Sequence, residues 1–426
     1  RDGPRAPHRI WPSIVRIYNL QLKAVIPFLF GALLFVPVFD SELSAHAPIM
    51  IVCGLIAIVH IATYAPRSGL RAAGEARLEA WTKILERGLT TAAYLSLYAL
   101  GVTSVVAYAT AFLFGALFGL FFALLWVRNT LRIYVGRTGG QGDMGEAWLN
   151  NRTLLLQALP FAITLGVLPY VVRIEKFIVG LELGVDSAAL FHVAQLAWLA
   201  GLVIPQALRA ALLPVLGKVR HHPEEFYREM KASFDICLGL LPVGIFAGAG
   251  IVKLFLPLAF PSQYLDGSLG ASAVDLFVVL LLGWCFTLLA TPTYTALQAG
   301  LHPWRFTFFI VIVVGFSAAV GFAFIGWQAD EGLTEGLFAA VYASTLSALF
   351  ALLASIHLSG SWHLVLERGT EWLVAVSCAT LACYGLLNGT LFALAGVVLF
   401  AFMPQALRAV GSTAQGNTPL KTIEAE

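Results

Sequence analysis

The stretch that decides the fold is AVDLFVVLLLGWCFTLLATPTYTALQAGLHPWRFTFFIVIVVGFSAAVGFAFIGW, residues 273–327. It holds two apolar runs around a short turn at His302 and Pro303, and its only charged residues are Asp275 and Arg305. Each run exceeds the roughly 20 apolar residues that a helix needs to cross a bilayer. A helix also satisfies its own backbone hydrogen bonds in lipid. The stretch therefore predicts two transmembrane helices joined by a tight turn.

The rest of the chain repeats this pattern. Its 426 residues are 59% hydrophobic and 12% charged, whereas soluble domains carry about 25% charged residues. The sequence predicts an all-α fold, a polytopic transmembrane helix bundle of about twelve helices. The twelve expected spans are 24–39, 48–65, 86–100, 104–127, 154–180, 188–213, 233–256, 273–298, 305–327, 336–357, 371–387 and 391–408.

The distribution of charge predicts how the spans are oriented. Lys and Arg gather in the cytoplasmic connections of membrane proteins. Most of the 26 Lys and Arg residues lie in the N-terminal segment, in the even-numbered connections and in the C-terminal tail. The odd-numbered connections carry acids instead, such as Asp40, Glu182 and Asp330. We therefore expect a multi-pass protein of the cell's inner (cytoplasmic) membrane with both termini of this chain in the cytoplasm.

Composition and motifs exclude several classes of function. The net charge of +2 and the lack of a basic arm argue against a nucleic-acid partner. The five cysteines form no CxxC, so we expect neither a disulfide framework nor a metal site. The sequence contains no P-loop, HExxH or GxSxG motif, and no cofactor is expected. The longest outer loop, about 257–272, is too short for a catalytic domain, so we expect a protein that is not an enzyme.

Ionisable residues inside a predicted span are the candidate functional residues, because they cost at least about 2.5 kcal/mol at the bilayer centre and usually face a cavity. Arg173 and Lys176 lie three residues apart in the fifth span and should share a helical face, with Glu175 between them pointing partly elsewhere. Gln206 and Arg209 lie in the sixth span. Two cations on one face could hold a phosphate or pyrophosphate within the membrane. The alternative is that these side chains reach the headgroups from the interface.

An ordered series of weak motifs resembles the oligosaccharide and polysaccharide flippases of the MOP (MATE-like) exporter superfamily. RIEKFIVGLELGVDSAALFHVA, residues 173–194, resembles the seventh helix of that family and its following turn. ALRAALLPVLGKV, residues 207–219, resembles the end of the eighth helix, and TYTALQAGLHPWRF, residues 293–306, the tenth helix and its basic turn. APRSGLRAAGEARLEAWTK, residues 65–83, resembles the turn after the fourth helix. In this register the first two family helices are missing, and we expect further sequence upstream of Arg1.

The resemblance implies two pseudo-related lobes and a C-terminal helix pair. Residues 1–150 would form a truncated N-terminal lobe of four helices, residues 151–360 a six-helix C-terminal lobe, and residues 361–426 an extra helix pair with a cytoplasmic tail. In such flippases a central cavity lined with cations receives the pyrophosphate of a polyprenyl-linked oligosaccharide. The expected partners are therefore the lipid bilayer, a lipid-linked glycan and glycan-assembly enzymes. By position, the substrate-binding candidates are Arg173, Glu175, Lys176, Gln206 and Arg209.

The leading interpretation is a flippase that moves a polyprenyl-diphosphate-linked oligosaccharide for polysaccharide biosynthesis. One alternative is a cation-coupled multidrug exporter of the same superfamily, which would favour buried carboxylates in the N-terminal lobe. We expect no acid in the middle of the first four spans, and this counts against the exporter. Another alternative is a polytopic membrane enzyme of cell-surface glycan assembly.

Overall fold

The computed structural model describes residues 11–12, 14–21, 23, 47–73, 75–137 and 151–416. Within those ranges the regular structure is helical throughout, without strands. The expected span at 24–39 lies outside the described residues. The chain divides into two compact units, residues 1–148 and 149–426.

The first unit contains three described long helices, α3 (Ala47–Ala72), α4 (Ala76–Ala99) and α5 (Val105–Arg137). Helix α5 packs against both α3 and α4. The segment around Ile14 joins this core, and the Tyr18 hydroxyl donates a hydrogen bond of 2.6 Å to the Ala62 carbonyl of α3.

The expected spans 48–65 and 86–100 leave residues 66–85 between them, but α3 and α4 fill nearly all of that segment. Only residues 73–75 separate the two helices. The intervening sequence is rich in Arg, Ala, Leu and Glu, which all favour helix, and the i,i+4 pair of Glu79 and Lys83 lies at 3.5 Å. Hydropathy marked where the apolar part of each helix ends, but the helices continue beyond it.

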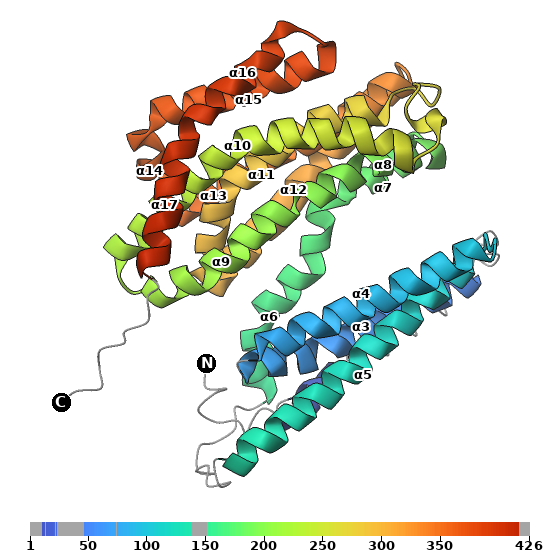
Figure 1. Cartoon of the computed structure of the whole chain (residues 1–426), viewed down its shortest axis with the longest axis vertical. Coiled ribbons are helices and arrows are strands. Elements are labelled where there is room, and N and C mark those ends of the chain that lie inside the picture. The colour runs from blue at the N-terminus through green and yellow to red at the C-terminus, as the bar shows by residue number, and fades with distance from the viewer. Residues whose placement is uncertain are drawn as a thin grey trace. The chain divides into compact units, whose positions relative to one another are not determined.

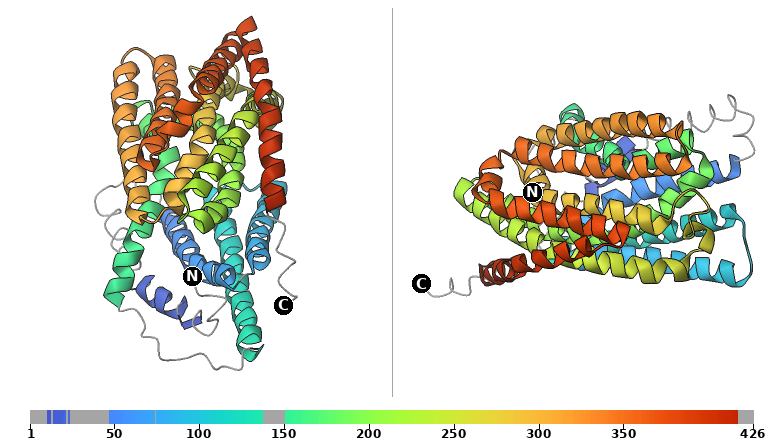
Figure 2. Two further views of the ribbon diagram at one scale, coloured as in Figure 1. Left: turned by 90° about the vertical axis from the view of Figure 1, so that its left-hand side faces the viewer. Right: turned by 90° about the horizontal axis from the view of Figure 1, so that it is seen from above.

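The second unit is built around α11 (Ala273–Ala299), most of which is buried. Helices α10 (Pro223–Ala259), α12 (Pro303–Ala329) and α13 (Leu333–Ser359) run alongside it (Figures 1 and 2). Helix α8 (Val185–Gly201) and helix α9 (Val203–Val219) also contact α11. Because other helices surround most of α11, its sequence is largely apolar instead of amphipathic.

Close approach of α10 to α11 depends on glycine. Gly244 faces the ring of Trp284, and Gly248 faces Leu281 at 3.2 Å from the position a Cβ would take. The same spacing recurs in the first unit, where Gly115 and Gly119 of α5 face α4. Small residues four apart allow helices in membranes to pack closely.

The C-terminal helices pack on the outside of this unit. They are α14 (Trp362–Glu367), α15 (Gly369–Asn388) and the helical segment 391–416, made of η4 (Leu391–Leu394), α16 (Ala395–Val398), η5 (Leu399–Phe402) and α17 (Met403–Gly416). Helix α15 contacts α11 and α17 contacts α10.

Ion pairs join the start of α10 to α14 and to the start of α15. Lys231 lies 2.5 Å from Glu367, and Arg368 pairs with Asp235. The hydrogen bond from Lys231 holds the pKa of the exposed Glu367 carboxyl below its usual value.

Nine helical segments of the described residues are long and apolar enough to cross a membrane. Among the expected spans in those residues, α4 falls short because Lys83, Glu86 and Arg87 interrupt it, and the span at 154–180 is broken into α6 (Asn151–Val167) and α7 (Ile174–Glu182). The predicted all-α polytopic bundle is confirmed.

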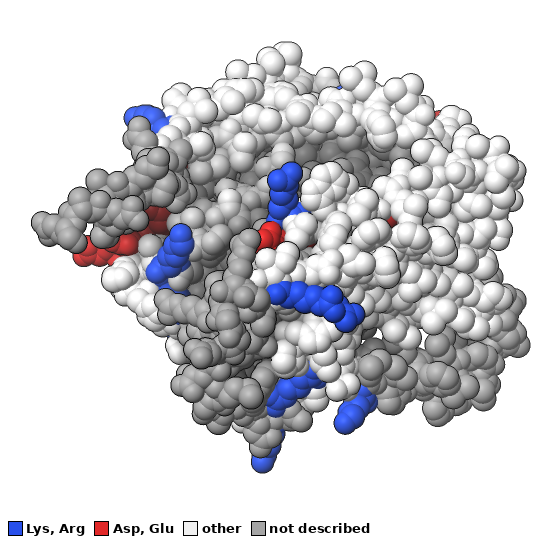
Figure 3. Space-filling model, turned by 60° about the horizontal axis from the view of Figure 1, so that its bottom comes forward, with Lys and Arg blue, Asp and Glu red and all other residues white. Residues whose placement is uncertain are grey.

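Charged residues gather near helix ends. Arg128 and Arg132, for example, are exposed in the second half of α5. The face shown in Figure 3 carries several Lys and Arg side chains and few acids.

Candidate functional site

A break in one membrane helix forms one wall of the candidate site. Helix α6 ends at Val167, a 3₁₀ turn (η2, Leu168–Val172) follows, and α7 starts at Ile174. Pro169 lies in the turn, and proline has no N–H to continue the helical hydrogen bonds. The freed carbonyl of Val172 accepts a 2.6 Å hydrogen bond from the Gln195 side chain of α8. Irregular backbone in a membrane protein needs such a partner.

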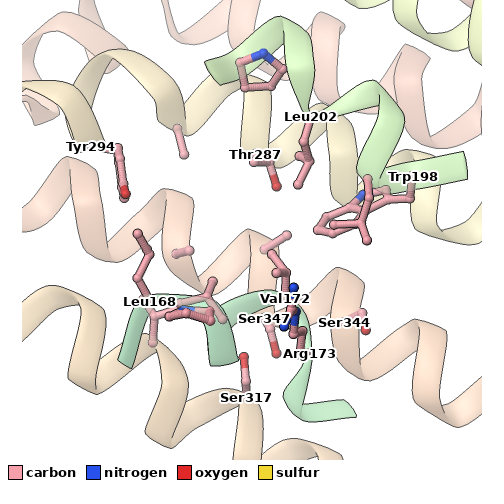
Figure 4. A pocket seen from close by; sticks show the side chains of 18 of the residues that line it. Leu168, Val172, Arg173, Trp198, Leu202, Thr287, Tyr294, Ser317, Ser344 and Ser347 are labelled. Carbon is pink, nitrogen blue, oxygen red and sulfur yellow. The ribbon is translucent and has the colours of Figure 1, made fainter. Parts of the chain in front are cut away.

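A cavity of about 450 Å³ opens beside this break, entirely within the second unit. Its walls come from η2, α7, α8, α9, α11, α12 and α13. Most of the lining surface is apolar, which suits a membrane site, but polar and charged side chains from several helices reach it. Arg173 and Ser347 project into it from one side, and Thr287 and Tyr294 from the other (Figure 4). The other polar or charged lining residues are Glu175, Gln195, Trp198, Gln206, Arg209, Thr291, Ser317 and Ser344.

Arg209 is held in place by an aromatic wall. Its Nη1 donates a 3.0 Å hydrogen bond to the Tyr294 hydroxyl, and its Cζ lies 5.5 Å from the centre of the Tyr294 ring. That ring packs edge-on against Phe306 and Phe309 of α12. The guanidinium is thereby oriented, because a cation over an aromatic face gains electrostatic attraction. It makes no other hydrogen bond with the described residues, which leaves four of its five donors for other partners.

Glu175 is the most buried charged residue of the cavity, at 2% exposed. It lies in the first turn of α7, with Ser317 of α12 beside it. A helix N-terminus favours a negative charge by a few tenths to about 1 kcal/mol. Glu175 thus adds a buried carboxyl to the cavity that Arg173 and Arg209 also line.

The structure brings four of the five predicted site residues to one cavity. Arg173, Glu175, Gln206 and Arg209 all line it, whereas Lys176 does not. Lys176 lies near His192 of α8, on which both it and Arg173 act electrostatically.

Of the two cations expected to share a helical face, only Arg173 lines the cavity. Arg173 precedes α7 as its N-cap, with φ −131° and ψ −14°, whereas Lys176 lies within the helix. Glu175, expected to point partly elsewhere, lines the cavity instead.

Sequence reasoning missed most of the hydroxyl groups. Thr287, Thr291 and Tyr294 recur at i, i+4 and i+7 on α11, and Ser344 and Ser347 lie three apart on α13. This helical spacing was a readable signal that each set shares a face. Ser317 is isolated in its helix and carries no comparable signal.

The first unit holds a buried acid that contradicts another expectation. Glu86 of α4 is 3% exposed and forms an ion pair with Arg67 of α3. The predicted span began at residue 86, which placed the acid at the membrane edge. Because α4 begins at Ala76, Glu86 lies in mid-helix.

Comparison with known proteins identifies the fold. No family model and no curated protein sequence matches this chain. Among solved structures it is similar to MATE in complex with MaL6, with TM-score 0.55 and 16% identity over 84% of this chain and 79% of that one. It is also similar to MATE in the straight conformation, with TM-score 0.54 and 18% identity over 82% and 78%.

The lipid II flippase MurJ in an inward closed conformation is a third similar structure, with TM-score 0.56 and 13% identity over 95% of this chain and 84% of that one. The chain therefore has a MATE-like fold, and the expected resemblance is confirmed at the level of the fold.

Proposed function

We propose that this chain is a membrane transporter that flips a polyprenyl-diphosphate-linked oligosaccharide across the cytoplasmic membrane. The observation that carries the proposal is that Arg173 and Arg209 line one cavity of the second unit. A diphosphate entering a low-dielectric space loses its hydration, and charge-assisted bonds from guanidinium groups offset that cost. Arginine suits this role because its planar donors match phosphate oxygens in pairs.

The remaining polar groups fit the sugar part of such a substrate. The hydroxyls of Thr287, Thr291 and Ser347 donate to carbonyls of their own helices and so offer acceptor oxygens. The Ser344 hydroxyl has no hydrogen-bond partner among the described residues and can both donate and accept. The apolar lining between them excludes water without binding charge. A structural neighbour is a lipid II flippase, which supports a lipid-linked substrate for a cavity of this composition.

The proposal includes the arrangement implied by the resemblance. Residues 1–150 and 151–360 would act as opposed lobes, with residues 361–426 as an added helix pair. Both termini would lie in the cytoplasm, and the transporter would receive its substrate from membrane enzymes of glycan assembly. It would itself catalyse no covalent step.

The direct test is flipping of a fluorescent polyprenyl-diphosphate oligosaccharide in liposomes that contain the full chain. The double variant Arg173→Gln, Arg209→Gln should slow flipping about tenfold or more, because each lost charge-assisted bond is worth about 1.5–3 kcal/mol. Lys253→Gln is the matched control, since Lys253 is exposed on α10 and does not line the cavity. Equal rates for the double variant and the wild type would overturn the proposal.

A cation-coupled multidrug exporter is the second candidate, favoured by two buried acids. Glu175 lines the cavity and Glu86 is buried in the first unit. Cells that express the exporter would accumulate less of a cationic dye such as ethidium, and Glu175→Gln would abolish the difference. The flippase proposal expects no dye efflux by the wild type.

A further inference from the structure

The first unit contains a second polar pocket, of about 340 Å³. His60, Tyr64 and Arg67 of α3 form one wall, and Lys83, Glu86 and Arg87 of α4 form the other. On α3 the lining residues recur at i, i+4 and i+7, so one face of the helix is polar although the helix is otherwise apolar. We call these six residues the α3–α4 pocket.

A buried ion pair forms the floor of the α3–α4 pocket. The side chains of Arg67 and Glu86 form an ion pair while only 12% and 4% exposed. Arg67 Nε also donates to the Thr82 hydroxyl at 3.2 Å. Gly119 of α5 lies directly under Glu86, where a Cβ would approach Oε2 to 2.8 Å. The Nη1 nitrogen of Arg67 has no hydrogen-bond partner among the described residues, so one pair of donors is left over.

The rim of the pocket is positive and open. The side chains of Lys83 and Arg87 are 60% and 64% exposed. Their ion pairs are loose, at 3.5 Å from Lys83 to Glu79 and 3.9 Å from Arg87 to Glu86. The Arg87 guanidinium also lies 5.3 Å from the centre of the Phe112 ring, which orients it.

Charge does not balance inside the pocket. Three cations and one carboxylate line it, an excess of 3 − 1 = 2 positive charges. The ion pair between Arg67 and Glu86 joins α3 to α4, and neither Lys83 nor Arg87 is part of it. Lys83 and Arg87 lie one turn apart on α4, and a bound anion would offset the repulsion between them.

We infer that the α3–α4 pocket binds a phosphate group, with Lys83, Arg87 and the spare donors of Arg67 as its ligands. Tyr64 adds a hydroxyl donor at the rim, where it is 54% exposed. The phosphate chemistry has two sources, a diphosphate on a lipid-linked glycan or the phosphodiester headgroup of an anionic lipid. The inference is independent of the flippase proposal, because every residue involved lies in the first unit.

Calorimetric titration of the full chain with pyrophosphate, in a neutral detergent, tests the inference. The background variant Arg173→Gln, Arg209→Gln removes binding in the cavity of the second unit. In that background pyrophosphate should still bind, and adding Lys83→Gln and Arg87→Gln should weaken binding by about tenfold or more. Arg77→Gln is the matched control, since Arg77 is exposed on the same helix and does not line the pocket.

The result that would overturn the inference is pyrophosphate binding unchanged by Lys83→Gln and Arg87→Gln, weakened equally by Arg77→Gln, or absent from the background variant. Competition then distinguishes the two sources. Displacement of pyrophosphate by phosphatidylglycerol, with phosphatidylcholine as the neutral lipid, identifies a headgroup site. Displacement by polyprenyl diphosphate alone identifies a cargo site. If the full chain bound pyrophosphate in this pocket but did not flip the lipid-linked oligosaccharide, the proposed function would be contradicted and the phosphate site would not.

Discussion

Gln195 compensates for the main-chain break beside the cavity, because its side-chain amide bonds the carbonyl of Val172. Gln195→Leu keeps a side chain of similar size and removes the donor. The unpaired carbonyl should lower the free energy of unfolding by about 1 kcal/mol or more. Thermal unfolding of the purified protein in detergent measures the change.

Gln206→Leu is the control for that variant. Gln206 lines the same cavity but is exposed, and its replacement should change stability by less than about 0.5 kcal/mol. Equal losses for the two variants would show that the Gln195 hydrogen bond does not support the break.

At the residue scale, the sequence indicates which side chains are candidates for function, but it does not predict which residues they contact. Arg173 and Arg209 stand out because charge is rare in apolar spans. The partner of Arg209 could not be predicted, since Tyr294 lies 85 residues away in the chain. Lys176, predicted as a site residue together with Arg173, does not line the cavity. Glu86 was misplaced because a hydropathy boundary was taken for a helix boundary.

At the element scale, Gly244 sets the distance between α10 and α11. A Cβ at this position would overlap the Trp284 ring, whereas Gly250 of the same helix has nothing within 4 Å. Gly244→Leu should lower the free energy of unfolding by about 1–3 kcal/mol or more through overpacking. Gly250→Leu should be neutral or stabilising, since leucine favours helix over glycine by nearly 1 kcal/mol.

Thermal unfolding of the two glycine variants side by side checks this expectation. The helix-propensity change is common to both, so the difference between them reports packing alone. If Gly250→Leu proved as destabilising as Gly244→Leu, the close contact of α10 with α11 would be refuted.

The elements that hydropathy located well are those whose apolar run is bounded by polar turns. The expected span at 273–298 matches α11, Ala273–Ala299, almost residue for residue. The expected span at 154–180 contains a break, because the apolar composition continues through the 3₁₀ turn at Leu168–Val172. Hydropathy averages over about 19 residues, so it cannot register a five-residue change of backbone geometry. Pro169 was the local signal for that change.

At the scale of the whole molecule, the order of helices and turns carries more information than residue identity. The MATE-like fold is retained with only 13–18% identity to the similar structures. Lipid demands apolar helices of a set length and leaves most side chains interchangeable. A resemblance in the order of motifs could therefore predict the fold, whereas the substrate depends on a few cavity residues.

The charge pattern also predicts a topology for the second unit that labelling can test. Helices α10, α11 and α12 each qualify as a span, so the turns at their ends must alternate between the two sides of the membrane. His222 and His302 begin α10 and α12, and Ser262 and Glu331 follow their ends. All four residues are exposed.

Single cysteines at these four positions, in a chain whose five native cysteines are replaced by serine or alanine, report the side directly. Ser262→Cys and Glu331→Cys should react with a membrane-impermeant maleimide in intact cells. His222→Cys and His302→Cys should react only after permeabilisation, because basic connections stay in the cytoplasm. The reverse pattern would contradict the cytoplasmic placement of the termini. Labelling in intact cells of both His222→Cys and Ser262→Cys would contradict α10 as a single span, and labelling of both His302→Cys and Glu331→Cys would contradict α12.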